Sequence, residues 1–99
     1  MSKDPDQIDL FEAISMLSDH DEVERFFYDL CTPQEIKAMK ERWKICKALA
    51  FDNLSYREIR QKFGVSTTTV TRVARFLTDE PCQGYKLLLE KIKKGEKQC

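Results

Sequence analysis

The stretch of sequence that decides the fold is residues 54–75, which read LSYREIRQKFGVSTTTVTRVAR. The pattern predicts two short helices joined by a tight turn. Ser55 and Glu58 have the spacing of a capping box at the start of the first helix. Gly64 provides the left-handed backbone that a sharp bend requires, and Ser66 offers an N-cap to the second helix.

The second predicted helix has an apolar side and a polar side. Val70, Val73 and Leu77 repeat at helical spacing and should face the core. The opposite side carries Thr67, Thr68, Thr69, Thr71, Arg72 and Arg75. Hydroxyls, methyl groups and guanidiniums are the groups that contact base edges and phosphates in a DNA major groove. The stretch therefore predicts a DNA-binding helix-turn-helix at about residues 55–77.

A helical protein-protein interaction module without DNA binding is the alternative. Such a module would also need a glycine turn and apolar residues at helical spacing, and it could bind an acidic protein through the apolar stripe of residues 43–50 and the basic side chains around it. It would not need an exposed face rich in threonine, because threonine is a mediocre helix former. The threonines therefore favour the DNA-binding interpretation.

Charge is unevenly distributed along the 99 residues, although the formal net charge is zero. Residues 1–32 hold nine acids and two bases, a net of −7, whereas residues 33–78 hold ten bases and four acids, a net of +6. A basic middle segment is expected where one face of a protein meets phosphate. The length predicts a single domain, residues 1–99.

Metal-binding, catalytic and membrane functions find no support in the sequence. The cysteines are far apart, at Cys31, Cys46, Cys82 and Cys99, and His20 is the one histidine. We therefore expect free thiols, no metal site and no cofactor. No nucleophile–base pair or glycine-rich phosphate loop indicates an enzyme. Without a long apolar run or a signal-peptide pattern, we expect a cytoplasmic protein with no membrane partner.

The remaining sequence also has helical spacing, and we predict an all-α fold of six helices. Capping patterns start a first helix near Asp4 and a long helix near Thr32, which should end at about Phe51. The second helix has its apolar face at residues 23–30, and the last helix follows Gly84. The residues expected to be buried on the last helix are Tyr85, Leu88, Leu89 and Ile92.

Six helices in a chain of this length leave little room for one compact core. Their wide apolar stripes and short connections predict that two chains share a core as a homodimer. A two-fold pair would present two DNA-reading helices, an arrangement that fits double-stranded DNA with a palindromic operator.

Residues 31–77 resemble the corresponding region of the tryptophan repressor family without a gap. The matching positions are Thr32, Pro33, Glu35, Ala38, Arg42, Ile45, Leu49, Ser55, Arg57, Glu58, Gly64, Thr69, Thr71 and Arg72. The whole chain is similar to the YerC/YecD branch of that family. The resemblance implies a TrpR-like, intertwined, all-helical homodimer that binds operator DNA and represses transcription.

The resemblance also implies roles for individual residues. Arg57 and Arg60 match cationic DNA contacts on the first helix of the motif. Four threonines of the second helix match positions that approach bases directly or through water; they are Thr67, Thr68, Thr69 and Thr71. The family binds an amino-acid corepressor with a threonine and two arginines, which match Thr32, Arg42 and Arg72.

Two positions depart from the family pattern where the corepressor binds. Val73 replaces a glycine and Phe76 replaces a serine, so larger apolar side chains should fill the space that the indole ring occupies. We therefore expect operator binding without tryptophan. Whether another small molecule acts as corepressor is left open by the sequence.

Overall fold

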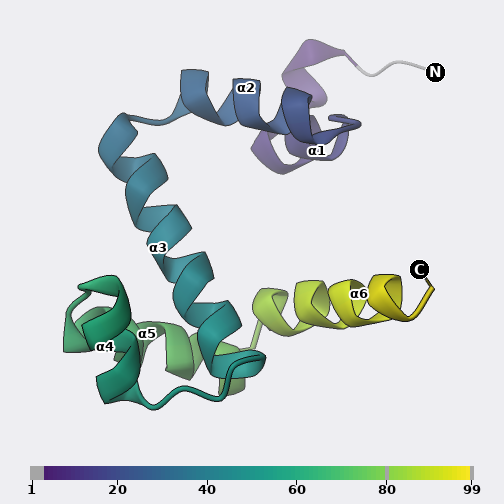
Figure 1. Cartoon of the computed structure of the whole chain (residues 1–99). Helices are drawn as coiled ribbons and strands as arrows, with labels where there is room; N and C mark the ends of the chain where they lie inside the picture. Colours follow the sequence, from purple (N-terminus) through teal and green to yellow (C-terminus); the bar gives the residue numbers. More distant parts are fainter. Residues whose placement is uncertain (1–3, 80, 99) are drawn as a thin grey trace. The chain divides into compact units, whose positions relative to one another are not determined.

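The computed structural model describes residues 4–79 and 81–98. Within these residues the chain forms one short 3-10 helix, six α-helices and no strand (Figure 1). The α-helices are α1 (Leu10–Ser15), α2 (His20–Leu30), α3 (Pro33–Ala50), α4 (Tyr56–Phe63), α5 (Thr67–Thr78) and α6 (Gly84–Gln98). The predicted all-α class with six helices is confirmed.

The chain divides into two compact units, Met1–Lys37 and Ala38–Cys99, and the boundary between them falls within α3. The assignment of residues 1–99 to a single domain stays a prediction.

The first helix begins later than the sequence predicts. Asp4 makes no side-chain cap, and Pro5–Gln7 forms a single 3-10 turn that ends at the extended residue Ile8. Asp9 is the effective N-cap of α1, because its carboxylate accepts the N–H of Glu12 at 2.8 Å. The Asp9 carboxylate thus satisfies one of the N–H groups that the first turn of α1 leaves without a partner in the helix.

The apolar side chains of α1 and α2 are largely exposed to solvent. No described residue of either helix is buried, and Phe11 is 77% exposed. Phe26 and Phe27 are half-buried, and their rings contact each other edge to face with centroids 6.0 Å apart. The amphipathic helices that the sequence predicts are therefore present, but this unit buries little of their apolar surface by itself.

The start of α3 follows the sequence prediction. Thr32 and Glu35 form a reciprocal capping box, in which the Thr32 hydroxyl accepts the Glu35 N–H at 3.1 Å and the Glu35 carboxylate accepts the Thr32 N–H at 2.8 Å. The helix continues to Ala50, close to the predicted end at Phe51. The left-handed backbone of Asn53, with φ 53°, follows shortly after this end.

The core of the second unit is built by α3, α4, α5 and α6. Its buried members are Ile45, Cys46, Ala48, Ile59, Val70, Val73 and Leu89. Trp43, Leu54, Phe63, Val65 and Leu77 are partly buried and pack against this cluster. The apolar stripes that the sequence predicts for α3 and α5 therefore converge on one core.

The last helix departs from prediction at one of its four expected core residues. Leu89 is buried and Tyr85 and Ile92 are half-buried, but Leu88 is 47% exposed. Residues 85, 88, 89 and 92 all lie within about 100° of one another around the helix, so spacing alone does not separate Leu88 from Leu89. The orientation of α6 places Leu89 in the core and leaves Leu88 at the exposed edge of that face.

The expected free thiols are found at the three cysteines that the structure describes, Cys31, Cys46 and Cys82, while Cys99 lies outside the described residues. Burial raises the pKa of the Cys46 thiol.

Replacing Ile59 with alanine should lower the free energy of unfolding by about 2–5 kcal/mol, because Ile59 is the one fully buried side chain that α4 contributes to the described core. Chemical denaturation monitored by circular dichroism measures this loss. Gln61→Ala, at an exposed position on the same helix, is the control and should change stability by less than about 0.5 kcal/mol. Equal stability of the two variants would contradict the assigned core.

Candidate nucleic-acid interface

The start of α4 and the turn after it are fixed by local hydrogen bonds. The Ser55 hydroxyl accepts the Glu58 N–H at 3.1 Å, and the Glu58 carboxylate accepts the Ser55 N–H at 2.8 Å. These hydrogen bonds to Ser55 lower the pKa of the Glu58 carboxyl. Gly64 ends the helix with φ 67° and ψ 32°, and its N–H donates to the Arg60 carbonyl at 2.9 Å. Both sequence-predicted features, the capping box and the glycine turn, are confirmed.

The second helix of the motif starts at the predicted cap. The Ser66 hydroxyl accepts the Thr69 N–H at 3.2 Å and lies 2.9 Å from the Thr69 hydroxyl. Thr69 is half-buried, whereas Thr67, Thr68 and Thr71 are exposed. The cap thus engages Thr69, and the other three hydroxyls are the more accessible to a ligand.

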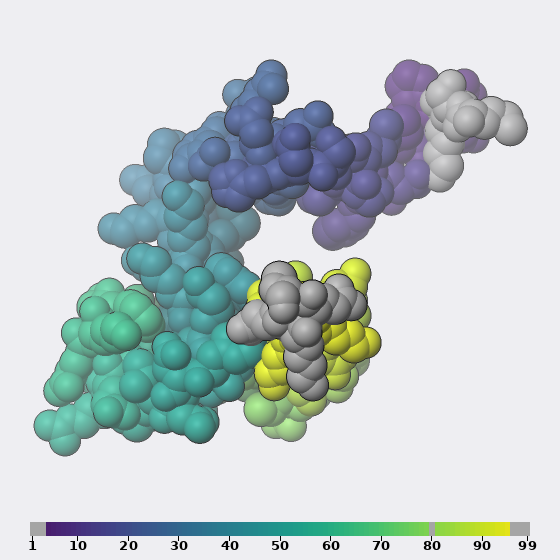
Figure 2. All heavy atoms as spheres, turned by 45° about the vertical axis from the view of Figure 1, so that its right-hand side comes forward, coloured from purple at the N-terminus to yellow at the C-terminus, as the bar shows by residue number. Residues whose placement is uncertain are grey.

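Packing fixes which side of α5 faces solvent. Val70 and Val73 are 0% and 1% exposed in the core, and α5 contacts both α4 and α6. Rotation of α5 about its own axis would pull these valines out of the core. The same packing leaves Arg72 and Arg75 exposed on the opposite side together with the accessible threonines. Atoms of the helix-turn-helix segment lie at the molecular surface (Figure 2).

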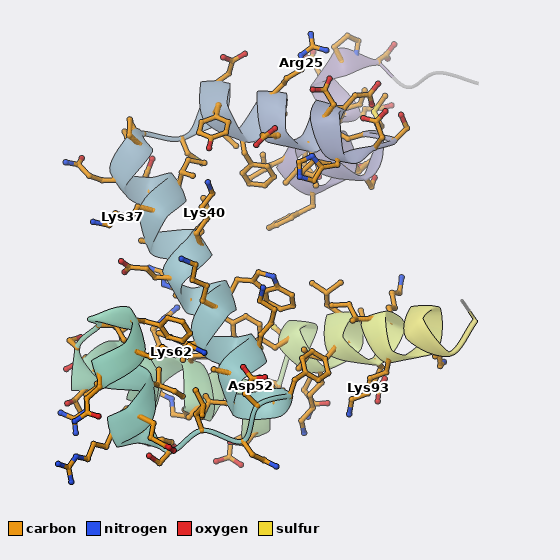
Figure 3. All side chains as sticks on the ribbon, in the orientation of Figure 1. Arg25, Lys37, Lys40, Asp52, Lys62 and Lys93 are labelled. Atoms are coloured by element: carbon orange, nitrogen blue, oxygen red, sulfur yellow. The ribbon has the colours of Figure 1, made fainter. Side chains whose placement is uncertain are left out.

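The first helix of the motif adds further positive charge. Arg57 and Arg60 are exposed on α4. Among the described residues, no carboxylate forms an ion pair with either guanidinium. Lys62 also projects from α4 (Figure 3), and its Nζ lies 5.7 Å from the centroid of the Phe63 ring. The predicted arginines of α4 are therefore available to an anionic partner.

The arginines of α5 share one aromatic ring. The Cζ atoms of Arg72 and Arg75 lie 4.6 and 5.3 Å from the centroid of the Phe76 ring. Phe76 is half-buried. Next to it lies a cavity of about 310 Å³, which is lined by Arg72, Phe76, Cys82, Gln83, Gly84 and Tyr85. Val73 is buried in the core and is not part of this lining.

The three residues predicted to hold a corepressor are placed differently. Burial, and to a lesser extent the charge of Cys46, raise the pKa of the Tyr85 hydroxyl, and the charges of Arg42 and Arg72 oppose part of this rise. Thr32 belongs to the first unit, where its hydroxyl caps α3. Of the three residues, Arg72 lines the same cavity as Tyr85.

Tyr85 was expected in the core from its spacing alone, and its place beside Arg72 in the cavity lining was not predicted. A tyrosine within an apolar stripe is the signal that could have indicated this place, because the hydroxyl of a buried tyrosine usually has a polar neighbour. Its hydroxyl is the polar group that α6 adds next to Arg72.

The described residues hold neither a metal-ligand cluster nor a membrane-spanning helix. No group of three or more histidine, cysteine, aspartate or glutamate side chains there could hold a metal ion. No described helix has the length and apolar character needed to cross a membrane.

The sequence and the fold match known proteins over most of their length. The Trp repressor protein family matches residues 7–93. The uncharacterized protein YerC of Bacillus subtilis (strain 168) is 37% identical over 87 residues, which span 88% of this chain and 82% of YerC.

Two crystal structures share the fold. A TrpR-like protein from Eubacterium eligens ATCC 27750 is 38% identical, with a TM-score of 0.76 over 85% of this chain and 84% of that one. A protein from Staphylococcus aureus, described as a candidate Trp repressor, is 34% identical, with a TM-score of 0.76 over 85% of this chain and 82% of that one. The geometry of the helix-turn-helix and these matches agree, and the chain belongs to the Trp repressor family of helix-turn-helix DNA-binding regulators.

Proposed function

We propose that this protein is a sequence-specific transcriptional repressor that docks α5 in the DNA major groove as a homodimer and does not require tryptophan. The observation that carries the proposal is the burial of Val70 and Val73. Their burial sets the roll of α5 so that its threonines and arginines face outward together. An exposed helix with these groups on one side suits base and phosphate contacts.

The start of α5 also suits a phosphate group. The first turn of α5 contains no acidic residue, and its N-cap is the neutral Ser66. The partial positive charge at a helix N-terminus is therefore not offset by a carboxylate in that turn. Thr67 and Thr68 are exposed at the same end. DNA backbone contacts commonly use helix N-termini together with hydroxyl and guanidinium groups.

Dimerisation is supported by the apolar surface that each unit leaves exposed. In the first unit, Phe11 and Met16 are 77% and 68% exposed, and in the second unit Leu87 is 60% exposed. Burying such side chains against a second copy would remove apolar area from water. A two-fold dimer would also repeat α5 and thereby match a palindromic operator.

Independence from tryptophan is supported by the side chains at the two positions that depart from the family pattern. Val73 is already part of the core, and Phe76 is a ring that contacts Arg72 and Arg75. Val73 packs α5 against the core without a ligand. We therefore propose that α5 is ordered for DNA binding at all tryptophan concentrations.

Arg57→Ala and Arg60→Ala should each weaken binding to operator DNA, because each removes an exposed guanidinium from α4. Each lost phosphate contact should reduce the slope of log affinity against log salt by roughly 0.9. Fluorescence anisotropy titrations across a salt series measure both quantities, with DNA fragments selected from a random pool. Lys62→Ala is the control, and we expect a smaller effect. Affinity and slope that both stay at the wild-type values would remove the arginine from the interface.

Sedimentation equilibrium at low micromolar concentration should give a mass of about twice the 11.7 kDa of one chain. Leu88→Lys should shift the equilibrium toward monomer, because a charge replaces an exposed apolar side chain on α6. Lys91→Ala, at an exposed position on the same helix, should leave the mass unchanged. A folded wild-type monomer at this concentration would refute the dimer.

Isothermal titration calorimetry should detect no saturable tryptophan binding, and tryptophan should leave the DNA affinity unchanged. The double variant Val73→Gly/Phe76→Ser restores the small residues of the family pattern, and it should loosen α5 by removing buried apolar contacts. Tryptophan binding by wild type near micromolar affinity, or DNA binding that begins only after tryptophan is added, would contradict the proposal.

A further inference from the structure

Phe76 brings two like charges close together. Since the Cζ atoms of Arg72 and Arg75 lie 4.6 and 5.3 Å from one ring centroid, they are within about 10 Å of each other, which is comparable to the screening length in 0.1 M salt. Two guanidiniums at this separation repel each other. The negative face of an aromatic ring offsets part of that repulsion, and an anion bound to both would offset more.

The Phe76 ring is half-buried beside the start of α6. Phe76 follows the buried Val73 by three residues on α5 and is half-buried. It lines the same cavity as Gly84 and Tyr85 at the start of α6, and α5 and α6 are in contact. Spacing places Arg72 one helical turn before Phe76, so its side chain can reach along the helix to the ring. The two guanidiniums therefore lie against a half-buried ring beside the start of α6.

We propose that Phe76 is a positioning residue for DNA binding: its ring holds Arg72 and Arg75 as a pair directed at the phosphodiester backbone. The inference rests on the proposed DNA-binding function. A long arginine side chain loses rotamer freedom when it binds phosphate. Contact with the ring restricts both side chains before DNA arrives, so less freedom is lost on binding. A phosphate that contacts both guanidiniums would also offset part of their mutual repulsion.

The proposal differs from a purely structural role for Phe76. A ring that only fills space beside α6 could be replaced by another apolar side chain of similar size without effect on DNA binding. A ring that positions guanidiniums could be replaced only by another aromatic ring. Phe76→Leu and Phe76→Tyr form the matched pair that separates these roles, because leucine keeps apolar bulk and tyrosine keeps the π face.

The first test titrates labelled duplex DNA with each variant over a salt series. Phe76→Leu should bind roughly 3- to 10-fold more weakly than wild type, from the usual strength of cation–π contacts. Its salt slope should stay at the wild-type value, because both charges remain. Phe76→Tyr should bind within about twofold of wild type. By comparison, Arg72→Ala should lower the slope by roughly 0.9. Wild-type affinity for Phe76→Leu, or tighter binding, would overturn the inference.

A double-mutant cycle tests whether Phe76 acts through the arginines. Phe76→Leu should have no further effect on DNA affinity in an Arg72→Ala/Arg75→Ala background. The full loss persisting in that background would show that Phe76 acts by another route. Failure of wild type to bind any duplex would instead refute the proposed function. Wild-type binding that depends on the arginines but not on Phe76 would refute the positioning role alone.

A measurement without DNA keeps the inference testable if Phe76→Leu lowers stability. NMR relaxation of the arginine Nε–H groups in the free protein should show Arg72 and Arg75 more restricted in wild type than in the leucine variant. Arg57, on the neighbouring helix, is the internal control and should be unaffected. Thermal unfolding of each variant, with Phe76→Met as a second apolar replacement, verifies that the folded state is compared. Equal mobility of Arg72 and Arg75 with and without the ring would overturn the proposal.

Discussion

The contact of Val70 and Val73 with Ile45 and Ile59 is the interaction on which the rest of the second unit depends. All four side chains are buried in one cluster, and they come from three different helices. A helix that packs through one stripe can hold only one rotation about its axis. The polar face of α5 is therefore a consequence of what its apolar face contacts. The side chains that would read DNA need no direct support from one another to point in the same direction.

The two parts of the chain before and after the start of α3 differ in the sign of their charge. The segment before α3 is acidic and exposes apolar rings, whereas α3 to α5 are basic. The N-cap of α5 is the neutral Ser66, so no carboxylate offsets the partial positive charge at the helix start. Further along the helix, two arginines share one aromatic ring. Neutral overall charge thus conceals a local arrangement suited to an anionic partner. The two arginines that share the Phe76 ring distinguish this surface from an ordinary lysine-rich helix face.

Local features of this fold were predictable from the sequence, and features set by side-chain packing were less so. The caps at Ser55 and Ser66 and the glycine turn follow from short patterns that act within one helical turn. The first helix was placed wrongly because Asp4 and Asp9 are both plausible caps, and only the conformation of the chain between them decides. Exposure of Leu88 follows from the orientation of α6, which a broad apolar run does not specify.

The candidate site shows the same division. Exposed positions for Arg57, Arg60, Arg72 and Arg75 follow from helical spacing. The contact of Arg72 and Arg75 with the Phe76 ring depends on the side-chain rotamers, which the spacing of residues does not determine. Tyr85 lines the same cavity as Arg72 because α6 contacts α5, a tertiary relation that helical spacing does not determine.

The turn at Gly64 requires a left-handed backbone conformation, but it does not require a small residue. A Cβ added there would meet no atom within 4 Å, although φ is +67°. Space is therefore not what makes glycine necessary; chirality is, because an L side chain is disfavoured at this backbone angle. A D-amino acid would suit the same angle and would also restrict the unfolded chain, so it would favour the folded turn. Among the natural residues asparagine comes nearest, since it visits this conformation more readily than alanine. The bend between the two helices of the motif is thus a stereochemical constraint in otherwise open space.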